Sequence, residues 1–515
     1  MILADLYERH ARFRPHDVAV LSEGRRLTHA GLLDRARRLV SVIAERGIEP
    51  GERVAIIARN RVEYLETYAA CEIAGFVLVP LNHRLAVPEL KQICADAEPA
   101  LLLGAGELED TARALAEGTS SIRAVIGLDD PGPAGYGALV AASHATPPFH
   151  RPCPEDPALI VYTSGSTGRP KGVVHTQASL MAGAIQGSHE GQVLPTDISL
   201  IVMPLFHIGG KIEGMYLSLL GGALLLLASF DEREVMEVIA RERVTAAHLA
   251  PVMIQRLLDH PEIDRHDLSS LRLVHYASAP MPVPLLRRAI ARFGPIFHQV
   301  YGSTEGLGCT MLKPQQHVLE GQPEQTARLG SAGHPPLGCE IRIARDDGTS
   351  CAAGEVGEVL FKGPVLMKGY WRNEAATREA ITDGWYHTGD MGRLDEEDYL
   401  FIVDRKKDMI ISGGENIYSW EVEEALRTHP AVSECAVVAV PDPQWGEAVK
   451  AFVVLRPERE ATEAALVEHT RTRIAGYKKP RSIEFLREMP RLHHGKIDKK
   501  ALREPFWANH HRRVS

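Results

Sequence analysis

The chain has 515 residues, of which 45% are hydrophobic and 24% are charged, and its net charge is −9. This length exceeds what one hydrophobic core supports, so the sequence predicts two or more domains. The acidic balance disfavours nucleic acid as the main partner. The longest apolar run, residues 217–228, is about half of the ~20 residues that a membrane span requires. We therefore expect no integral membrane segment and interpret this run as a buried strand with a turn.

The seven cysteines are scattered along the chain without a Cys-x-x-Cys pair. This pattern is typical of free thiols in a reducing compartment and not of disulfides or a zinc site. Asp5, Glu8 and Arg9 interrupt the first turn, so the beginning of the chain does not resemble a charged-then-apolar leader. A cytoplasmic protein is the resulting expectation.

Helix and strand patterns alternate through the first part of the chain, which predicts an α/β fold with largely parallel sheets. The first predicted helices span residues 32–45, 63–73 and 89–97, and the first predicted strands span residues 54–58 and 76–81. Residues 108–150 are rich in Ala, Gly and Pro and have weak periodicity. We expect that segment at the periphery of the fold.

A predicted strand at residues 159–162 precedes a second α/β stretch between residues 198 and 297. Its predicted strands span residues 200–203, 223–227 and 273–276, and its predicted helix spans residues 234–242. Short apolar stretches split by Gly and Pro between residues 330 and 369 favour a small β-barrel. The pattern changes again at Asp404. We predict a large domain over residues 1–404, with two α/β subdomains and the barrel, and a small α+β domain over residues 405–515.

The loop after the strand at residues 159–162 has the sequence TSGSTGRPKG over residues 163–172. Its glycines allow a tightly curved backbone that presents N–H groups to an anion, its hydroxyls add donors, and Lys171 adds positive charge. It differs from the common nucleotide P-loop because no Ser or Thr follows Lys171. The loop predicts a phosphate-binding site, with a flexible linker as the alternative.

This loop resembles the signature of the adenylate-forming superfamily, which includes acyl-CoA synthetases, adenylation domains of peptide synthetases and luciferases. Further segments are similar to motifs of this superfamily, in the same order and along almost the whole chain. They are residues 204–210, 301–305, 385–390, 404–417 and 490–496. The resemblance implies a large AMP-binding domain followed by a small mobile lid domain.

Adenylation joins a carboxylate to the α-phosphorus of ATP, so cations are needed where two anions meet. The resemblance implies that Lys496 contacts both anions, that Lys171 holds outer phosphates, and that Glu305 binds Mg²⁺. The residues implied to bind ATP or AMP are Thr163, Ser164, Gly165, Ser166, Thr167, Gly168, Lys171, Ser278, Ala279, Tyr301, Gly302, Thr304, Asp390, Arg405 and Lys496. Without the resemblance, Lys496 reads as a surface lysine and Arg405 as a linker arginine.

A second step, transfer of the acyl group to coenzyme A, is also implied by the resemblance. The implied CoA contacts are Gly413, Gly414, Trp445, Tyr477 and Lys479, and Lys407 stands at the hinge position. The Gly pair removes side chains where a pantetheine arm passes the backbone, with a plain turn as the alternative. Residues 471–515 contain thirteen Lys or Arg against four Asp or Glu. That excess suits either a solvated surface or contact with CoA phosphates.

An acyl pocket is implied beside residues 204–210. Its candidate walls are His207, Ile208, Gly209, Lys211, Ala277, Gly302 and Gly308. The resemblance implies that His207 gates between the two steps. The walls are mostly small or apolar and include no arginine for a second carboxylate, which disfavours dicarboxylates. Lys211 and Glu213 are either core-adjacent surface residues or substrate contacts. A metal site at His207 or His275 is disfavoured, because no partner stands at a ligand spacing.

Together these features predict an AMP-forming acid–CoA ligase that uses ATP, Mg²⁺ and CoA, most similar to medium/long-chain fatty acyl-CoA ligases. The alternatives are an aryl-acid (benzoate- or coumarate-type) CoA ligase, a carrier-protein-loading or luciferase-type enzyme, and a nucleotide sensor without catalysis. The presence of Lys171, Glu305, Asp390 and Lys496 argues against the sensor. A homodimer is the expected oligomer.

Overall fold

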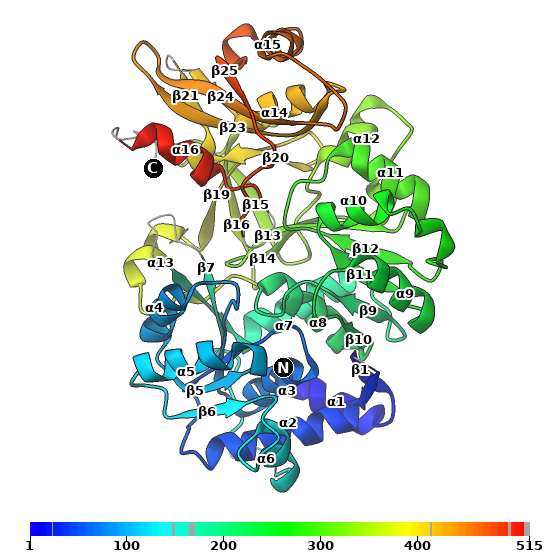
Figure 1. The fold of residues 1–515 in the computed structure, drawn as a ribbon, viewed down its shortest axis with the longest axis vertical. Helices are drawn as coiled ribbons and strands as arrows, with labels where there is room; N and C mark the ends of the chain where they lie inside the picture. The colour runs from blue at the N-terminus through cyan, green and yellow to red at the C-terminus, as the bar shows by residue number, and fades with distance from the viewer. Residues whose placement is uncertain (23, 147–149, 164–169, 413–414, 493–495, 509–515) are drawn as a thin grey trace. The chain divides into compact units, whose positions relative to one another are not determined.

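The computed structural model describes residues 1–22, 24–146, 150–163, 170–412, 415–492 and 496–508. It divides into two compact units (Figure 1). The first unit contains residues 1–341 and 361–386, and the second contains residues 342–360 and 387–515. The predicted domain boundary between residues 404 and 405 stays a prediction.

One sheet of the first unit has seven strands in the order β17-β8-β7-β4-β3-β5-β6. The strands are β3 (Arg53–Ile57), β4 (Val77–Pro80), β5 (Pro99–Gly104), β6 (Ala124–Gly127), β7 (Pro157–Thr163), β8 (Lys171–Thr176) and β17 (Gly369–Tyr370). The accompanying helices are α2 (His29–Ala44), α3 (Val62–Ala74), α4 (Val87–Ala97), α5 (Glu109–Gly118) and α6 (Tyr136–Ala142). Strands β3 to β7 pair in parallel, whereas β8 and β17 are antiparallel to their neighbours.

The second sheet of this unit has eight strands in the order β14-β13-β12-β11-β9-β10-β1-β2. The strands are β1 (Val18–Ser22), β2 (Arg25–Thr28), β9 (Ile198–Ile201), β10 (Ala223–Leu226), β11 (Ala246–Leu249), β12 (Leu273–Tyr276), β13 (Phe297–Ser303) and β14 (Leu307–Leu312). The helices of this part are α1 (Leu3–Phe13), α7 (Gln177–Glu190), α8 (Ile208–Leu220), α9 (Glu232–Glu242), α10 (Pro251–Asp259), α11 (Val283–Phe293) and α12 (Pro323–Ala327). Only the edge strands β2 and β14 run antiparallel to their neighbours among the described strands.

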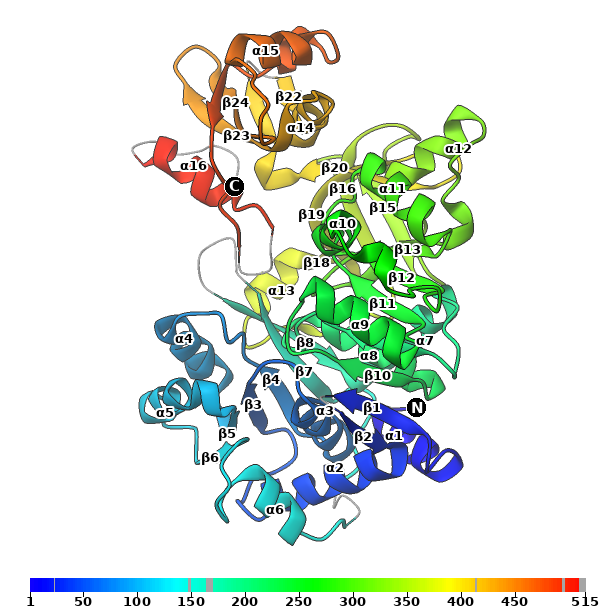
Figure 2. The ribbon, with the colours of Figure 1, turned by 45° about the vertical axis from the view of Figure 1, so that its right-hand side comes forward.

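Helices α7 and α8 run between the two sheets of the first unit (Figure 1), where α7 contacts β8 and β14 and α8 contacts β9 and β10. The opposite face of the eight-stranded sheet packs against α9, α10 and α11 (Figure 2). Successive residues of a strand point to opposite faces. Each of the central strands therefore sends alternate side chains toward α7 and α8.

A five-stranded sheet, in the order β15-β16-β19-β18 with β20 paired to β19, forms the half-barrel expected from the Gly- and Pro-split pattern. Its elements are β15 (Glu340–Ala344), β16 (Gly357–Lys362), α13 (Glu374–Ala380), β18 (Ile381–Thr382), β19 (Trp385–Leu394) and β20 (Leu400–Arg405). The chain passes between the two units within β15, β16 and β19.

The second unit also contains a five-stranded sheet in the order β22-β21-β24-β23, with β25 paired to β24. The elements are β21 (Ile410–Ser412), β22 (Glu415–Ile417), α14 (Ser419–Arg427), β23 (Val432–Asp442), β24 (Gly446–Leu455), α15 (Glu463–Arg471), β25 (Ser482–Phe485) and α16 (Lys499–Trp507). The predicted α+β class of the C-terminal segment is confirmed.

The apolar run at residues 217–228 differs from its prediction. Its first residues complete α8, which ends at Leu220 because Gly221 adopts a left-handed φ of 82°. Only the second half of the run is a strand, β10. Residues 108–150 do contain regular structure, and their strand β6 lies at a sheet edge, as expected for a peripheral segment. Within the described residues, no helix is long and apolar enough to cross a bilayer, and all seven cysteines are free thiols.

Candidate active site

The predicted phosphate loop is closed by a β-hairpin. Strands β7 and β8 pair antiparallel up to Thr163 and Lys171, where Thr163 Oγ1 lies 3.5 Å from Lys171 O. The intervening candidates Ser164, Gly165, Ser166, Thr167 and Gly168 lie outside the described residues. Thr163 and Lys171 therefore stand at the two ends of the loop.

A tyrosine outside the predicted motifs connects Lys171 with Glu305. The Lys171 ammonium lies 4.9 Å from the centre of the Tyr370 ring, and the Tyr370 hydroxyl donates to Glu305 Oε1 at 3.0 Å. Tyr370 is in β17 and pairs with Val173 of β8. Burial and the Glu305 carboxylate raise the pKa of Tyr370, so its hydroxyl stays protonated and donates. One tyrosine thus positions both a cation and a carboxylate.

A buried histidine also connects the strand of Lys171 with the segment of Glu305. His175 of β8 has its Nε2 atom 2.7 Å from Thr304 O. A carbonyl can only accept, so Nε2 carries the proton and donates. Complete burial lowers the pKa of His175 to about 4, which keeps the ring neutral at physiological pH. This neutral ring is a fixed link between the two predicted nucleotide-binding segments.

The other predicted nucleotide-binding residues of this unit lie at the carboxyl ends of parallel strands, where α/β sheets bind ligands. Ser278 and Ala279 follow β12, and Tyr301 and Gly302 lie near the end of β13. Ser278 has a left-handed φ of 72°, a strain that is characteristic of functional sites. A Cβ atom on Gly302 would lie 1.6 Å from Leu307 O, so the β13–β14 hairpin requires glycine there.

The predicted acyl-pocket walls come from neighbouring elements of the first unit. His207 precedes α8 and lies with its ring 6.0 Å from that of Phe206, while Ile208 and Gly209 begin the helix. Gly209 faces His248 of β11, the strand next to β12. Ala277 follows β12, and Gly302 pairs with Gly308 across the β13–β14 hairpin.

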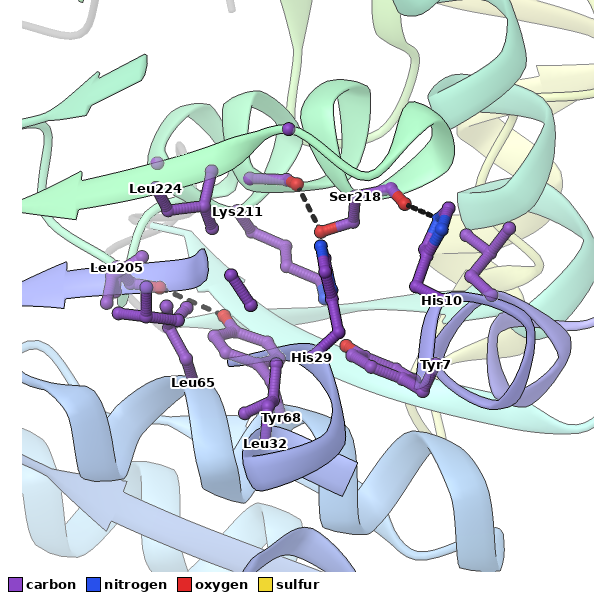
Figure 3. A pocket seen from close by; sticks show the side chains of 16 residues that line it. Tyr7, His10, His29, Leu32, Leu65, Tyr68, Leu205, Lys211, Ser218 and Leu224 are labelled. Atoms are coloured by element: carbon purple, nitrogen blue, oxygen red, sulfur yellow. Dashed lines mark hydrogen bonds between the residues drawn. The ribbon is translucent and has the colours of Figure 1, made fainter. Parts of the chain in front are cut away.

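Lys211 is a buried cation with an ion-pair partner in the structure. It is 6% exposed, forms an ion pair with Glu72 of α3, and lies 4.2 Å from the centre of the Tyr68 ring. Tyr7 donates to Glu72 Oε2 at 2.6 Å. Figure 3 shows Lys211, Tyr68 and Tyr7 around a cavity of ≈ 40 Å³, which is too small for an aromatic or fatty acyl group. A contact of Lys211 with the acyl group stays a prediction, and the structure shows its ammonium engaged by Glu72.

In the second unit, the two predicted ribose contacts are cross-strand partners. Asp390 of β19 is opposite Arg405 of β20, and Arg405 Nε lies 3.0 Å from Asp390 Oδ1. Asp390 is buried, and its backbone N–H donates to Thr388 Oγ1 at 3.1 Å. The Arg405 side chain is half exposed. An anchored carboxylate beside a guanidinium suits recognition of vicinal hydroxyls.

The predicted hinge is held on both sides by polar contacts. The Asp404 carboxylate accepts the backbone N–H of Ser419, and Asp408 pairs with Arg503 at 3.1 Å. Lys407 lies between them in a short 3₁₀ turn, and its side chain lies outside the described atoms. The hinge role of Lys407 stays a prediction.

The predicted CoA contacts that the structure describes are accessible. Trp445 is 39% exposed and Tyr477 is 53% exposed, and Lys479 is half-buried. The Arg481 guanidinium lies 5.3 Å from the Trp445 ring centre, which places a cation beside an exposed aromatic face. Gly413 and Gly414, the predicted contacts of the pantetheine arm, lie outside the described residues.

Lys496 and its neighbour Ile497 pair through the backbone with residues 491 and 492. Leu492 N donates to Lys496 O at 2.7 Å, and Arg491 bridges to Ile497. Residues 493–495, between these backbone pairs, lie outside the described part of the chain. The half-buried Lys496 thus belongs to an antiparallel backbone pair in the second unit.

Comparison with known proteins decides the family. The chain matches the family model of AMP-binding enzymes over residues 7–371 and that of the AMP-binding enzyme C-terminal domain over residues 421–496. The chain belongs to the AMP-binding enzymes. The predicted membership of the adenylate-forming superfamily is confirmed, and with it the assignment as an enzyme.

Relatives of this AMP-binding enzyme match it over nearly its whole length. It is 40% identical to a feruloyl-CoA synthase of Amycolatopsis sp, over 97% of this chain and 98% of the relative. It is 35% identical to a long-chain-fatty-acid–CoA ligase of Mycobacterium tuberculosis, over 94% of each chain. The crystal structure of ATP-bound MatB from Rhodopseudomonas palustris matches with a TM-score of 0.90 at 29% identity, over 99% of each chain.

Glu305 suits the Mg²⁺ ion that the sequence predicts for this AMP-binding enzyme. Its carboxylate is half-buried, and one oxygen is oriented by Tyr370. Mg²⁺ binds through one or two carboxylates together with substrate phosphates and waters, so it does not need an all-protein cage. Among the described residues, no group of three His, Cys, Asp or Glu side chains is placed to hold a metal ion.

Tyr370 and His175 are the site residues that the sequence analysis missed. Tyr370 lies outside every predicted motif, 65 positions from Glu305. His175 is three residues beyond the predicted loop, and nothing in the sequence marks its link to Thr304. The roles of both residues depend on the pairing of β8 with β7 and β17, which the sequence alone does not give.

Proposed function

We propose that this AMP-binding enzyme is an acid–CoA ligase. In the first step a carboxylate attacks the α-phosphorus of ATP, which gives an acyl-AMP and releases pyrophosphate. In the second step the CoA thiolate attacks the acyl carbon, and AMP leaves with the bonding electron pair. The observation that carries the proposal is the Lys171–Tyr370–Glu305 cluster, because it holds a phosphate-binding cation and a metal-binding carboxylate at the predicted loop.

The residues of the first unit bind and orient the phosphates. Lys171 offers its ammonium to the outer phosphates, while the Tyr370 ring restricts where that ammonium lies. Glu305 would hold Mg²⁺, which neutralises phosphate charge when bound. Positive groups fixed before the reaction favour the transition state because they need no reorganisation when charge develops.

Lys496 is proposed to hold the substrate carboxylate against the α-phosphate. Asp390 and Arg405 are proposed to bind the ribose. The CoA nucleotide is proposed to contact Trp445, Tyr477 and Lys479, and the pantetheine arm is proposed to pass Gly413 and Gly414. Removing one preorganised charge slows a reaction about 10²–10³-fold. We expect that loss for acyl-AMP formation by Lys496→Ala, with thioester formation from preformed acyl-AMP spared.

The acid is proposed to be aromatic. The feruloyl-CoA synthase matches at 40% identity and the fatty-acid ligase at 35%, and the small walls Gly209, Ala277, Gly302 and Gly308 suit a planar ring near the carboxylate. The fatty acid predicted from the sequence is the second candidate, and the relative from M. tuberculosis supports it.

One assay tests the activity and the acid together. Purified enzyme is given ATP, Mg²⁺ and CoA with cinnamate, benzoate, octanoate or palmitate, and both AMP and thioester are measured. Thioester formed in equal amount to AMP is the expected result, with cinnamate or benzoate preferred. AMP formed without CoA thioester would contradict CoA as the acceptor. A preference for octanoate or palmitate would contradict the aromatic acid and leave the ligase activity standing.

A further inference from the structure

Three buried histidines form a row across the eight-stranded sheet. His248 of β11 is in register with His275 of β12, and His275 is in register with His298 of β13. Residues in register on parallel strands point to the same face. This histidine row (His248, His275 and His298) is at most 6% exposed, and the rings of His275 and His298 lie 4.9 Å apart.

Helix α8 places a carboxylate on the histidine row. Glu213 Oε2 lies 2.8 Å from His275 Nδ1, and Glu213 Oε1 accepts from Ser199 Oγ at 2.8 Å. Burial alone would raise the pKa of Glu213, but His275, His248 and Ser199 lower it to about 2. Glu213 is therefore an ionised acceptor. An ionised carboxylate cannot donate, so His275 Nδ1 is the donor in their hydrogen bond.

The histidine row is left incompletely hydrogen-bonded by the described residues. Both ring nitrogens of His298 and the Nε2 atom of His275 have no partner among them. The ring nitrogens of His248 also lack a hydrogen bond of good geometry, although the Gly209 backbone is near. Burial lowers the pKa of His248 and His298, so each ring has one N–H donor and one acceptor lone pair. Buried polar atoms are normally satisfied.

The histidine row lies on the same side of the sheet as the predicted acyl pocket. Side chains two residues apart on a strand share a face, so Ala277 follows His275 and Gly302 follows His298 on the face toward α8. Two residues of strand advance about 7 Å and four advance about 13 Å. The row therefore stands below the small walls of the pocket, deeper in the sheet than the carboxyl ends of the strands.

His248 is the member of the row that lies against Gly209, a predicted wall of the pocket. A Cβ atom on Gly209 would lie 3.5 Å from His248 Cε1, so the ring faces a position of α8 that has no side chain. His275, in contrast, is engaged with Glu213. His298 is completely buried. Among the three, His248 is the ring that an acid lying along the small walls reaches first.

We propose that His248 is a specificity-determining residue that binds a hydroxyl group at the distal end of an aromatic acid, which makes the substrate a phenolic acid. This inference rests on the proposed acid–CoA ligase function and deepens it. A phenolic hydroxyl both donates and accepts, as a neutral imidazole does. The phenolic hydroxyl can hydrogen-bond to the His248 ring, whereas a fatty chain or an unsubstituted ring leaves the His248 ring nitrogens unpaired. Glu213 holds the neighbouring His275 ring in place through their hydrogen bond.

The test compares 4-hydroxycinnamate with cinnamate, which differ by the one hydroxyl. For wild-type enzyme we expect kcat/KM for thioester formation to favour 4-hydroxycinnamate about 10- to 100-fold, since sites built to bind a hydroxyl discriminate against analogues without it. His248→Leu should bring the ratio near one while cinnamate is still used. His248→Gln, which retains a donor and an acceptor, should keep part of the preference.

His29→Leu is the matched control, because His29 is a buried histidine beside the cavity on the Lys211 side of α8 (Figure 3). The ratio should stay at its wild-type value in this variant. A wild-type ratio near one, or an unchanged ratio in His248→Leu, overturns the inference and leaves the ligase activity intact.

Binding measured without turnover separates the inference from the proposed function. If no acid yields a thioester, the ligase proposal fails, and thermal stabilisation by each acid still reports its binding. We expect greater stabilisation by 4-hydroxycinnamate than by cinnamate. If this difference is lost in His248→Leu and kept in His29→Leu, it supports the contact between His248 and the substrate hydroxyl. Equal stabilisation by both acids in all variants would overturn it.

Discussion

Helix α8 carries two buried ionisable residues whose surroundings differ on its two sides. Lys211 is paired with Glu72 and covered by the Tyr68 ring, whereas Glu213 binds His275 beside histidine nitrogens that lack partners among the described residues. Two positions along a helix are about 200° apart. Lys211 therefore points toward α3, whereas Glu213 points toward the eight-stranded sheet. A buried charge with all its partners stabilises the fold. Buried polar atoms without partners are unusual, and the proposed contact with the substrate hydroxyl is placed at such atoms.

The largest effect is expected on the Lys211 side. Lys211→Met leaves the Glu72 carboxylate buried without its cation, and breaking a buried ion pair costs about 3–5 kcal/mol. Lys211→Met combined with Glu72→Leu removes both charges and should recover most of that loss. Urea unfolding followed by circular dichroism would measure both. If the double variant is no more stable than the single one, the pair is not the source of the stability.

Glu213 is expected to contribute through its ionisation. Its folded pKa is about 2 against an ordinary value of 4.5. A depressed pKa gives stability that is present above the unfolded pKa and is lost as the pH falls from about 4.5 toward 2. The contribution is about 3 kcal/mol, from the shift of the pKa. Glu213→Gln lacks this contribution, so its stability should fall less than that of the wild type over this pH range.

Guanidinium unfolding at pH 5 and pH 3 measures the pH effect. Asp34→Asn, which changes an exposed carboxylate on α2, is the control and should follow the wild type. Parallel losses in Glu213→Gln and the wild type would mean that the histidines do not hold the Glu213 carboxylate in its charged form.

Lys171, at the end of the predicted phosphate loop, differs from Lys211 in the group that its ammonium contacts. The Lys211 ammonium is neutralised by a carboxylate, whereas the Lys171 ammonium lies over the uncharged Tyr370 ring. The Tyr370 ring does not neutralise Lys171, which suits the phosphate-binding role proposed for this lysine. Both lysines contact a tyrosine, but the Tyr370 hydroxyl goes to Glu305 of the site, and the Tyr7 hydroxyl goes to Glu72 of the structural pair.

Tyr370→Phe should lower kcat about 10-fold, since one hydrogen bond to a charged group contributes about 1.5 kcal/mol, and it should raise the Mg²⁺ concentration needed for half-maximal rate. The ring remains, so Lys171 keeps its contact. Tyr7→Phe is the matched control on the other side and should leave both quantities unchanged. If the two variants behave alike, the Glu305 contact has no part in catalysis.

The sequence predicted the parts of the site that lie in continuous segments. Thr163, Lys171 and Glu305 are in short runs whose composition points to phosphate chemistry, and the fold class follows from alternating helix and strand patterns. Tyr370 and the histidine row could not be predicted in this way. Their significance depends on which strands pair and in which register, and single histidines at widely spaced positions give no pattern in one sequence.

Residues 211–213 show why local pattern leaves roles undecided. Lys211 and Glu213 stand in a largely apolar helix, and the sequence left both as either core-adjacent residues or substrate contacts. What the structure adds is the partner of each residue: α3 supplies Glu72 to Lys211, and β12 supplies His275 to Glu213. Both partners are more than 60 residues away along the chain.

The smallest expected effect tests the comparison within α8 itself. Gly209→Ala adds a methyl group at ordinary contact distance, 3.5 Å, from His248, and Gly214→Ala adds one 3.4 Å from Leu224 on the Lys211 side. Both glycines are helical, so alanine should cost no stability and adds up to about 1 kcal/mol through helix propensity. Only Gly209→Ala covers the histidine row. We expect it to lower the 4-hydroxycinnamate preference about 3-fold, which corresponds to about 0.7 kcal/mol. Gly214→Ala should leave that preference unchanged, and an equal change in both variants would show that the two sides of α8 do not differ in access to substrate.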